Sequence, residues 1–330
     1  GYYHARMGLL LRQQGIKPDF EWLPLTILND ESFYDHHLLY HLYLSLFTAR
    51  DPVFDAGSSM TQSIKVASVI LPALAFTAVW WLLRSLRIRW AAVWTLGLFV
   101  VSEAFLYRMN MPRAQSASLL VLALGLYAFF SRRYWLLLPL GFLYVWLYDA
   151  FPLLLAVAVV YVAATWLTER RFAWQALLFP TVGIALGLYL NPYFPQNIAF
   201  IVNHLLPKIG DSTTRVGNEW YPYRSWTLIE NSGFALVAFV LGALAWSWRK
   251  VRIDRVGLTL FLLAAFFGLL LFRSRRFVEY FPAFAWLYAV VSIAGLYEAR
   301  VTGRKLWSRV APFVLLLFLL GPMLLTLSQA

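Results

Sequence analysis

The chain is a succession of about ten apolar stretches, each close to the roughly 17 to 25 residues that a helix needs to cross a bilayer. Tight turns such as Asp149–Pro152 separate several of them. A segment inside a bilayer must satisfy its own backbone, so such stretches fold as helices. We therefore predict an all-α, polytopic transmembrane helix bundle. Its expected spans are 63–83, 90–107, 114–131, 134–149, 151–168, 174–190, 232–248, 256–272, 277–297 and 309–327.

Basic residues gather in alternate loops between these stretches. The clusters are Arg84/Arg87/Arg89, Arg132/Arg133, Arg170/Arg171, Arg249/Lys250/Arg252/Arg255 and Arg300/Arg304/Lys305/Arg309. By the positive-inside rule these loops share the cytoplasmic side. The count of spans then places Arg273, Arg275 and Arg276 on the outer side. A basic cluster that opposes the topology signal usually holds an anion.

Composition agrees with a membrane protein and excludes several other classes. Of all residues, 61% are hydrophobic and 13% charged. The net charge of +12 does not imply nucleic acid, because much of it orients the loops and meets anionic lipid. Cysteine is absent, which excludes disulfides, thiol catalysis and cysteine metal sites.

Two segments are too polar to be spans. Residues 1–58 are expected to form a first external loop whose apolar stretch Leu38–Phe47 is an amphipathic helix. Residues 191–231 form a second external loop within a bundle that covers 59–330. We expect at least one further membrane helix before Gly1, and no soluble C-terminal domain after the last apolar helix.

Three short motifs fall on the predicted outer side. They are Gly1-Tyr2-Tyr3-His4-Ala5-Arg6, Thr227-Leu228-Ile229-Glu230, and Arg275-Arg276-Phe277-Val278-Glu279-Tyr280-Phe281-Pro282. Together they resemble motifs of the GT-C glycosyltransferases, in particular the transmembrane part of oligosaccharyltransferase catalytic subunits. In that family the first motif is preceded by a catalytic Asp, which here would precede Gly1. The second motif resembles Thr-Ile-x-Glu at the end of a long external loop, and the third a stretch whose Arg contacts the lipid diphosphate.

The resemblance implies roles for individual residues. Glu230 is the predicted catalytic carboxylate, and Arg276 is expected to hold the phosphate. Other predicted substrate-binding residues are Tyr3, His4, Arg6, Arg275, Tyr280, Trp220 and Tyr221. The family also implies a divalent cation, Mg²⁺ or Mn²⁺. However, the loop 107–115 lacks the family's second acidic motif, and Arg108 and Arg113 there offer positive charge instead. The family's Trp-Trp-Asp motif is also absent from this chain.

Simpler interpretations stay open for each of these residues. Glu230 suits a helix N-terminus as a cap, and Glu279 could neutralise Arg275 or Arg276. Trp220 and Tyr221 either stack on sugar or anchor the loop at the headgroup level. Asp35, His36 and His37, with His41 one turn further, are weak candidates for metal ligands, and surface histidines are the commoner outcome.

The sequence thus favours a membrane glycosyltransferase. It would move a sugar or oligosaccharide from a polyprenyl-(di)phosphate carrier to an acceptor on the extracytoplasmic face of a bacterial or archaeal cell membrane. Its partners would be membrane lipid and the carrier-linked sugar. The main alternative is a non-catalytic GT-C-like membrane subunit that binds lipid or a protein partner. A flippase is a third alternative, although inverted repeats are not evident.

Overall fold

The computed structural model describes residues 2–19, 33–48, 58–205, 217–248, 254–301 and 305–329. All regular structure in these ranges is helical, as expected for the predicted fold class. The chain divides into two compact units, which are described separately. Unit 1 comprises Gly1–Leu74, Asn110–Ala158 and Gln175–Val216, and unit 2 comprises Ala75–Met109, Val159–Trp174 and Gly217–Ala330.

Unit 1 begins with two short helices that share a core. Helix α1 (Tyr2–Gln14) packs on α2 (Leu38–Ser45), the helical part of the apolar stretch predicted over Leu38–Phe47. The core they share with α10 (Gln196–Phe200) and the turn before it is aromatic and aliphatic. Its buried members are Met7, Leu10, Leu11, Phe33, Tyr34, Leu38, Tyr193 and Phe200. This core ties the N-terminal segment to the loop that follows α9 (Gln175–Tyr189).

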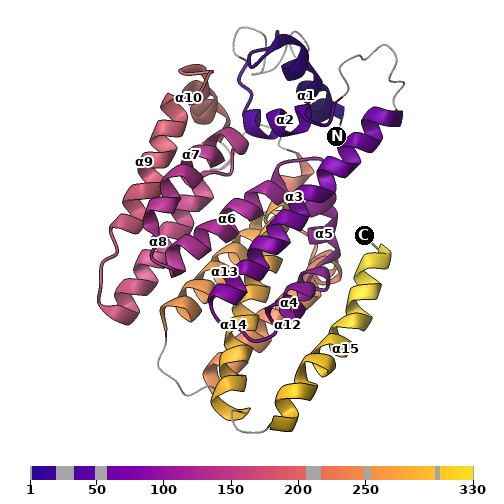
Figure 1. The fold of residues 1–330 in the computed structure, drawn as a ribbon, viewed down its shortest axis with the longest axis vertical. Coiled ribbons are helices and arrows are strands. Elements are labelled where there is room, and N and C mark those ends of the chain that lie inside the picture. Colours follow the sequence, from indigo (N-terminus) through magenta and orange to yellow (C-terminus); the bar gives the residue numbers. More distant parts are fainter. Residues whose placement is uncertain are drawn as a thin grey trace. The chain divides into compact units, whose positions relative to one another are not determined.

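Two helices of unit 1 approach each other through glycines. Helix α7 (Leu137–Leu147) packs side by side with α9 (Figure 1). A Cβ added at Gly183 would lie 2.1 Å from the Leu138 carbonyl oxygen, and one at Gly187 would lie 2.8 Å from that of Phe142. Small residues at such contacts let helix backbones pack closely, as is common in membrane bundles. The remaining helices of unit 1 are α6 (Gln115–Phe130), the short η2 (Tyr134–Leu136) and η3 (Ile201–Leu205), and the first parts of α3 (Ser58–Ser85) and α8 (Pro152–Glu169).

Unit 2 is organised around one buried helix. Helix α14 (Phe281–Val301) packs against both α12 (Ser225–Trp248) and α13 (Arg255–Arg273) (Figure 1). Most of α14 between Phe281 and Val291 is buried. The ring of Phe284 lies 4.6 Å from that of Phe267 on α13. Helix α15 (Lys305–Gln329) completes the unit.

The helices coincide in position with the predicted spans. In the described part of the chain, five helices are long and apolar enough to cross a membrane by length and composition. They are Ile64–Ser85, Pro152–Glu169, Ser225–Trp248, Arg255–Arg273 and Phe281–Glu298. Shorter apolar helices occupy four other predicted spans: Gln115–Phe130, Tyr134–Leu147, Gln175–Tyr189 and Val310–Leu324. The total number of spans stays a prediction.

The apolar stretch predicted as one span over 90–107 is divided into two helical parts. Helix α4 (Ala91–Leu96) continues into the 3-10 turn η1 (Gly97–Phe99), and α5 (Glu103–Asn110) then departs at 91°. The hydroxyl of Ser102 accepts a hydrogen bond from the Phe105 N–H at 3.1 Å, which caps the new helix. The indole N–H of Trp286 donates to the Trp94 carbonyl at 2.7 Å near the end of α4. The Ser102 hydroxyl thus satisfies a backbone N–H at the start of α5, and Trp286 adds a tertiary hydrogen bond to α4.

Helix α12 begins earlier than predicted and is kinked. It starts at Ser225 rather than near residue 232, and Ser232 has non-helical angles of φ −139° and ψ 16°. The Ser102 hydroxyl donates to the carbonyl of Asn231 at this kink. The expected start of the span thus marks the kink inside a longer helix.

Arginines of the basic loops end three helices. Arg87, Arg132 and Arg170 follow α3, α6 and α8 with left-handed φ angles of 58°, 57° and 56°. A cation is favourable at a helix C-terminus because the last carbonyls carry partial negative charge. The loops that suggest the cytoplasmic side therefore also cap the helices.

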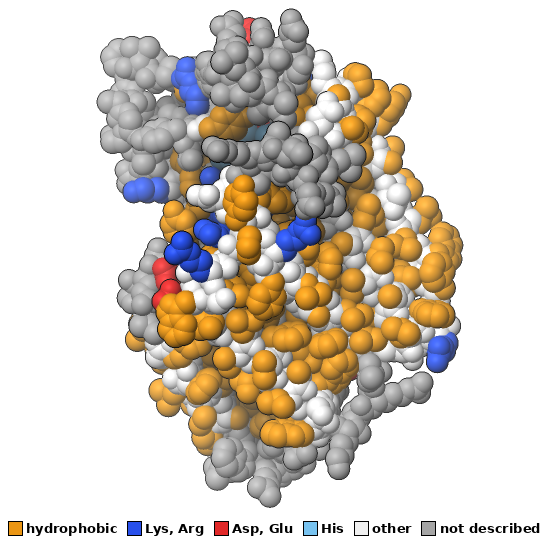
Figure 2. Space-filling view, turned by 180° about the vertical axis from the view of Figure 1, so that it is seen from behind, with side chains coloured by type: hydrophobic (Ala, Val, Ile, Leu, Met, Phe, Trp, Pro, Cys, Tyr) orange, Lys and Arg blue, Asp and Glu red, His pale blue; other side chains and the backbone are white. Residues whose placement is uncertain are grey.

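Large apolar side chains face outward over much of the described surface. On the face in Figure 2 hydrophobic side chains predominate and acidic ones are few. Leu269 and Phe272 on α13 and Phe318 on α15 are 72%, 59% and 72% exposed. A soluble protein rarely exposes so much apolar surface. Together with the apolar helices, this surface supports an integral membrane protein.

Candidate functional site

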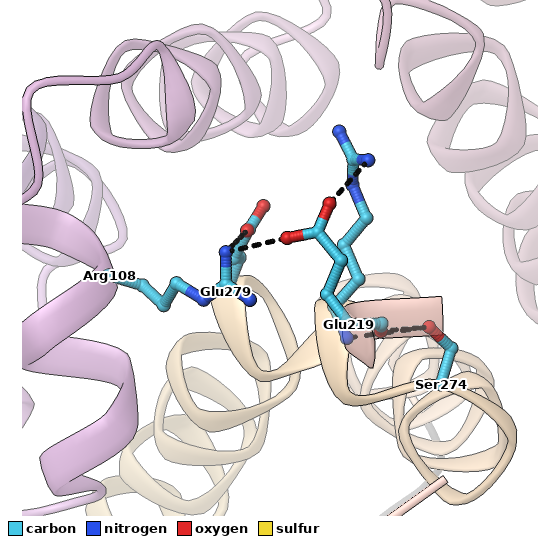
Figure 3. A network of polar contacts seen from close by, with 5 residues as sticks. Arg108, Glu219, Ser274 and Glu279 are labelled. Carbon is cyan, nitrogen blue, oxygen red and sulfur yellow. Dashed lines mark hydrogen bonds and ion pairs between the residues drawn. The ribbon is translucent and has the colours of Figure 1, made fainter. Parts of the chain in front are cut away.

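The predicted arginines lie in a cluster of charged residues within unit 2. Helix α13 ends at Arg273, Ser274 is extended, and the 3-10 turn η5 (Arg275–Glu279) leads into α14. Opposite this turn lies a second 3-10 turn, η4 (Asn218–Trp220), at the end of the long loop. Figure 3 shows how the side chains of these turns converge with one from α5.

Glu219 bridges two arginines in this cluster. Its Oε2 lies 3.0 Å from Arg108 Nη1, and its Oε1 lies 3.3 Å from Arg276 Nη1. The three side chains are part-buried, with exposed fractions of 28% for Glu219, 16% for Arg108 and 18% for Arg276. Two guanidinium groups thus share one carboxylate. Ion pairs in such a partly buried, low-dielectric environment are stronger than ion pairs at an open surface.

Glu279 is the second carboxylate of the cluster and is completely buried. Its Oε1 lies 3.4 Å from Arg108 Nη1 (Figure 3). Helix α5 brings Arg108 to Glu279, and the predicted pairing of Glu279 with Arg275 or Arg276 stays a prediction. A buried carboxylate without a cation beside it would destabilise the fold. Arg108 therefore stabilises the structure in addition to contributing positive charge to the cluster.

The aromatic residues of the loop stack on the arginines. The guanidinium of Arg276 lies 4.9 Å from the centre of the Trp220 ring, and that of Arg275 lies 5.4 Å from the Tyr223 ring. The Arg275 N–H also donates to the Tyr221 carbonyl at 3.1 Å. Trp220 and Tyr221 therefore lie beside Arg276 and Arg275, and their role in binding substrate stays a prediction.

Tyr280 has a different position from its neighbours in the motif. It is 2% exposed, and its ring stacks on Phe267 with centres 5.3 Å apart. The sequence predicts it as a substrate-binding residue, and that role stays a prediction. In the structure it follows the 3-10 turn η5 and contributes to the core of unit 2.

Glu230 lies on α12, two residues before the kink at Ser232, and its side chain is exposed. Helix α12 begins five residues earlier, so Glu230 does not cap the helix start. A carboxylate there can accept a proton from an approaching ligand. Its catalytic role stays a prediction.

A chain of buried polar groups occupies the N-terminal part of unit 1. The Nδ1 of His4 lies 2.7 Å from Nε2 of His41, and Nδ1 of His41 lies 2.8 Å from Oδ2 of Asp35. The other Asp35 oxygen accepts the His37 backbone N–H at 3.0 Å. An ionised carboxylate only accepts, so His41 donates from Nδ1 to Asp35, and the rings of His4 and His41 share the next hydrogen bond of the chain.

Burial keeps His4 neutral. Loss of solvation, and next the nearby His41, lowers the pKa of His4 from 6.5 to about 2. Burial likewise raises the pKa of Tyr3, whose ring lies 5.2 Å from that of His4. Arg6, one turn from Tyr3 on α1, is exposed. His4 thus offers a neutral imidazole held in one orientation.

The metal prediction finds no matching geometry. Among the described residues, no group of three His, Cys, Asp or Glu side chains is arranged to hold an ion. Asp35 already accepts hydrogen bonds from His41 and His37, and the ring of His36 stacks on Phe200 at 5.0 Å. Asp35, His36 and His37 therefore do not form a ligand set here. The divalent cation stays a prediction.

The predicted site residues fall into two groups. Arg275, Arg276, Trp220 and Tyr221 come together in unit 2, and Tyr3 and His4 join Asp35, His37 and His41 in unit 1. Sequence reasoning missed Glu219, whose partners lie 57 and 111 residues away. The positive charge predicted for the loop at Arg108 was the one available signal.

Comparison with known proteins shows a likeness of fold. No protein-family profile matches the sequence, and no curated protein matches it. Among solved structures, the chain is similar to the crystal structure of the Archaeoglobus fulgidus oligosaccharyltransferase tethered with an acceptor peptide containing the NVT sequon via a disulfide bond. The TM-score is 0.61 at 16% identity, over 99% of this chain and 50% of that chain. The chain therefore has an oligosaccharyltransferase-like fold and spans half the length of that protein.

Proposed function

We propose that the chain is a membrane glycosyltransferase of the GT-C type. It would transfer a sugar or oligosaccharide from a polyprenyl-(di)phosphate carrier to an acceptor on the extracytoplasmic face. The observation that carries this proposal is the pair of part-buried guanidiniums of Arg108 and Arg276, which share one carboxylate at the end of very apolar helices. The oligosaccharyltransferase-like fold supports it.

The proposed chemistry uses the two arginines as an anion site. An acceptor group would attack the anomeric carbon of the donor sugar while the bond from that carbon to the phosphate oxygen breaks. The phosphate oxygen leaves with the bonding electrons, and Arg108 and Arg276 would stabilise its negative charge. A carboxylate such as Glu230 would take the proton that the acceptor loses.

The test is binding of a polyprenyl phosphate to the purified chain in detergent. Arg276→Ala is expected to weaken binding by about 30-fold or more, as loss of a part-buried charged contact does. Arg273→Ala is the matched control, because Arg273 is an exposed arginine one turn away. It should change affinity by less than about fivefold, since water and salt screen it.

Two further outcomes bear on the proposal. Arg276→Lys should restore binding only in part, because an ammonium cannot make the two-pronged contact. Equal affinity for wild type and Arg276→Ala would remove the phosphate role. Binding without sugar transfer to any acceptor would favour the alternative of a non-catalytic lipid-binding subunit.

A further inference from the structure

Glu219 occupies the position that a bound anion would take. It contacts one nitrogen of Arg108 and one of Arg276 with its two oxygens, at 3.0 and 3.3 Å. A phosphate in the proposed site would use the same two guanidiniums. On the proposed function, the donor and the Glu219 side chain therefore compete for the same cations.

The backbone of Glu219 is fixed while its side chain is the exposed partner. The Glu219 carbonyl accepts a hydrogen bond from the Ser274 hydroxyl at 2.9 Å. Two later carbonyls of the same loop accept from Arg275: that of Tyr221 from the backbone N–H at 3.1 Å, and that of Pro222 from Nε at 3.2 Å. The Glu219 side chain is 28% exposed, against 16% for Arg108 and 18% for Arg276. A change of rotamer would thus release the carboxylate and leave the loop attached. Tethering also keeps its effective concentration at the arginines high.

Charge decides which ligands can displace it. These ion pairs join four side chains, Arg108, Arg276, Glu219 and Glu279, whose formal charges cancel, and Arg275 lies beside them. A phosphodiester headgroup carries one negative charge, so replacing Glu219 with it gains nothing. A phosphate monoester carries about −1.5 to −2 at pH 7, and a diphosphate diester carries two charges. Such ligands bind the arginines more strongly than a carboxylate does.

We propose that Glu219 is a specificity-determining residue that excludes monoanionic phosphodiester lipids from the arginine site and admits anions with about two negative charges. The surrounding membrane is rich in phosphodiester lipids, and an open pair of guanidiniums there would collect them. Among donors, the filter favours carriers linked to sugar through a diphosphate over those linked through a single phosphate.

The test compares two lipid probes on the whole chain in detergent at pH 8. One probe is polyprenyl monophosphate, close to a dianion, and the other is phosphatidylglycerol, a monoanion. Glu219→Gln is expected to raise the affinity for phosphatidylglycerol by about tenfold, the size expected when two partly exposed ion pairs no longer compete. The ratio of the two affinities should shrink accordingly. Glu219→Asp, with a shorter reach, should fall between.

Glu169→Gln is the matched control. Glu169 also pairs with an arginine, Arg255 at 3.7 Å, and the two are 31% and 14% exposed. Its removal should leave both affinities unchanged. If Glu219→Gln leaves the ratio unchanged, or weakens both probes, Glu219 is not a selectivity residue, although the arginine site stands. If Arg276→Ala weakens neither probe, the proposed anion site itself is wrong.

Discussion

Arg108 should contribute more to stability than any other cation of the cluster. Its guanidinium lies 3.4 Å from the carboxylate of Glu279, which is 0% exposed, and 16% of its own side chain is exposed. Replacing Arg108 with Gln leaves a buried carboxylate without this cation. Removing one partner of a buried pair costs about 3–5 kcal/mol. Glu219→Gln, which breaks contacts that are 28% exposed at the carboxylate, should cost about 1 kcal/mol or less.

The double variant Arg108→Gln/Glu279→Gln separates charge from packing. It removes both buried charges and keeps polar groups of similar size, so it should recover much of the loss seen in Arg108→Gln. Equilibrium unfolding in mixed detergent micelles measures the free energies. The reasoning is refuted if Arg108→Gln is as stable as wild type, or if the double variant is no more stable than the single one.

Three other perturbations test the fold and the N-terminal cluster. His4 has a lowered pKa, so the unfolded chain takes up a proton below about pH 6.5 that folded His4 does not. The free energy of unfolding should therefore fall as the pH drops below 6.5, by up to about 1.4 kcal/mol per pH unit for each such histidine. The fall should be less steep in His4→Gln. Identical thermal-unfolding profiles of the two proteins from pH 7 to 5 would contradict this. Gly183→Ala should destabilise the chain by about 2 kcal/mol or more, because its Cβ would lie 2.1 Å from the Leu138 carbonyl oxygen; unchanged unfolding in micelles would show that α7 and α9 do not pack this closely. An impermeant thiol reagent should label Ser85→Cys from one side of the membrane and Ser212→Cys from the other; Ser212 lies outside the described residues. Labelling of both variants from the same side would overturn the predicted topology.

The helices were predictable because hydropathy is a local signal. Nine of the ten expected spans coincide with a helix, since a bilayer requires long runs of apolar residues with satisfied backbones. The break between η1 and α5 was not predictable from this signal. Val100 and Val101 continue the apolar pattern across it, while the bond from Trp286 that accompanies the break comes from 192 residues away.

The candidate site was predictable in part for the same reason. Arg276 stood out as a charged residue at the predicted outer end of a span, and Trp220 as an aromatic residue of the predicted external loop 191–231. The direction of the Tyr280 side chain depends on the type of helical turn before it. Four residues along an α-helix, a side chain points about 40° away from the first one, whereas in a 3-10 helix it points about 120° away. Glu219 could not be assigned because ion pairs between distant loops leave no periodic pattern.

A cryo-EM structure of the chain with bound polyprenyl phosphate tests the central claim most directly. We expect the phosphate oxygens within about 3 Å of the guanidiniums of both Arg108 and Arg276, with the Glu219 carboxylate displaced from them. A phosphate bound elsewhere, with Glu219 still bridging the two arginines, would contradict the proposed anion site and the function built on it.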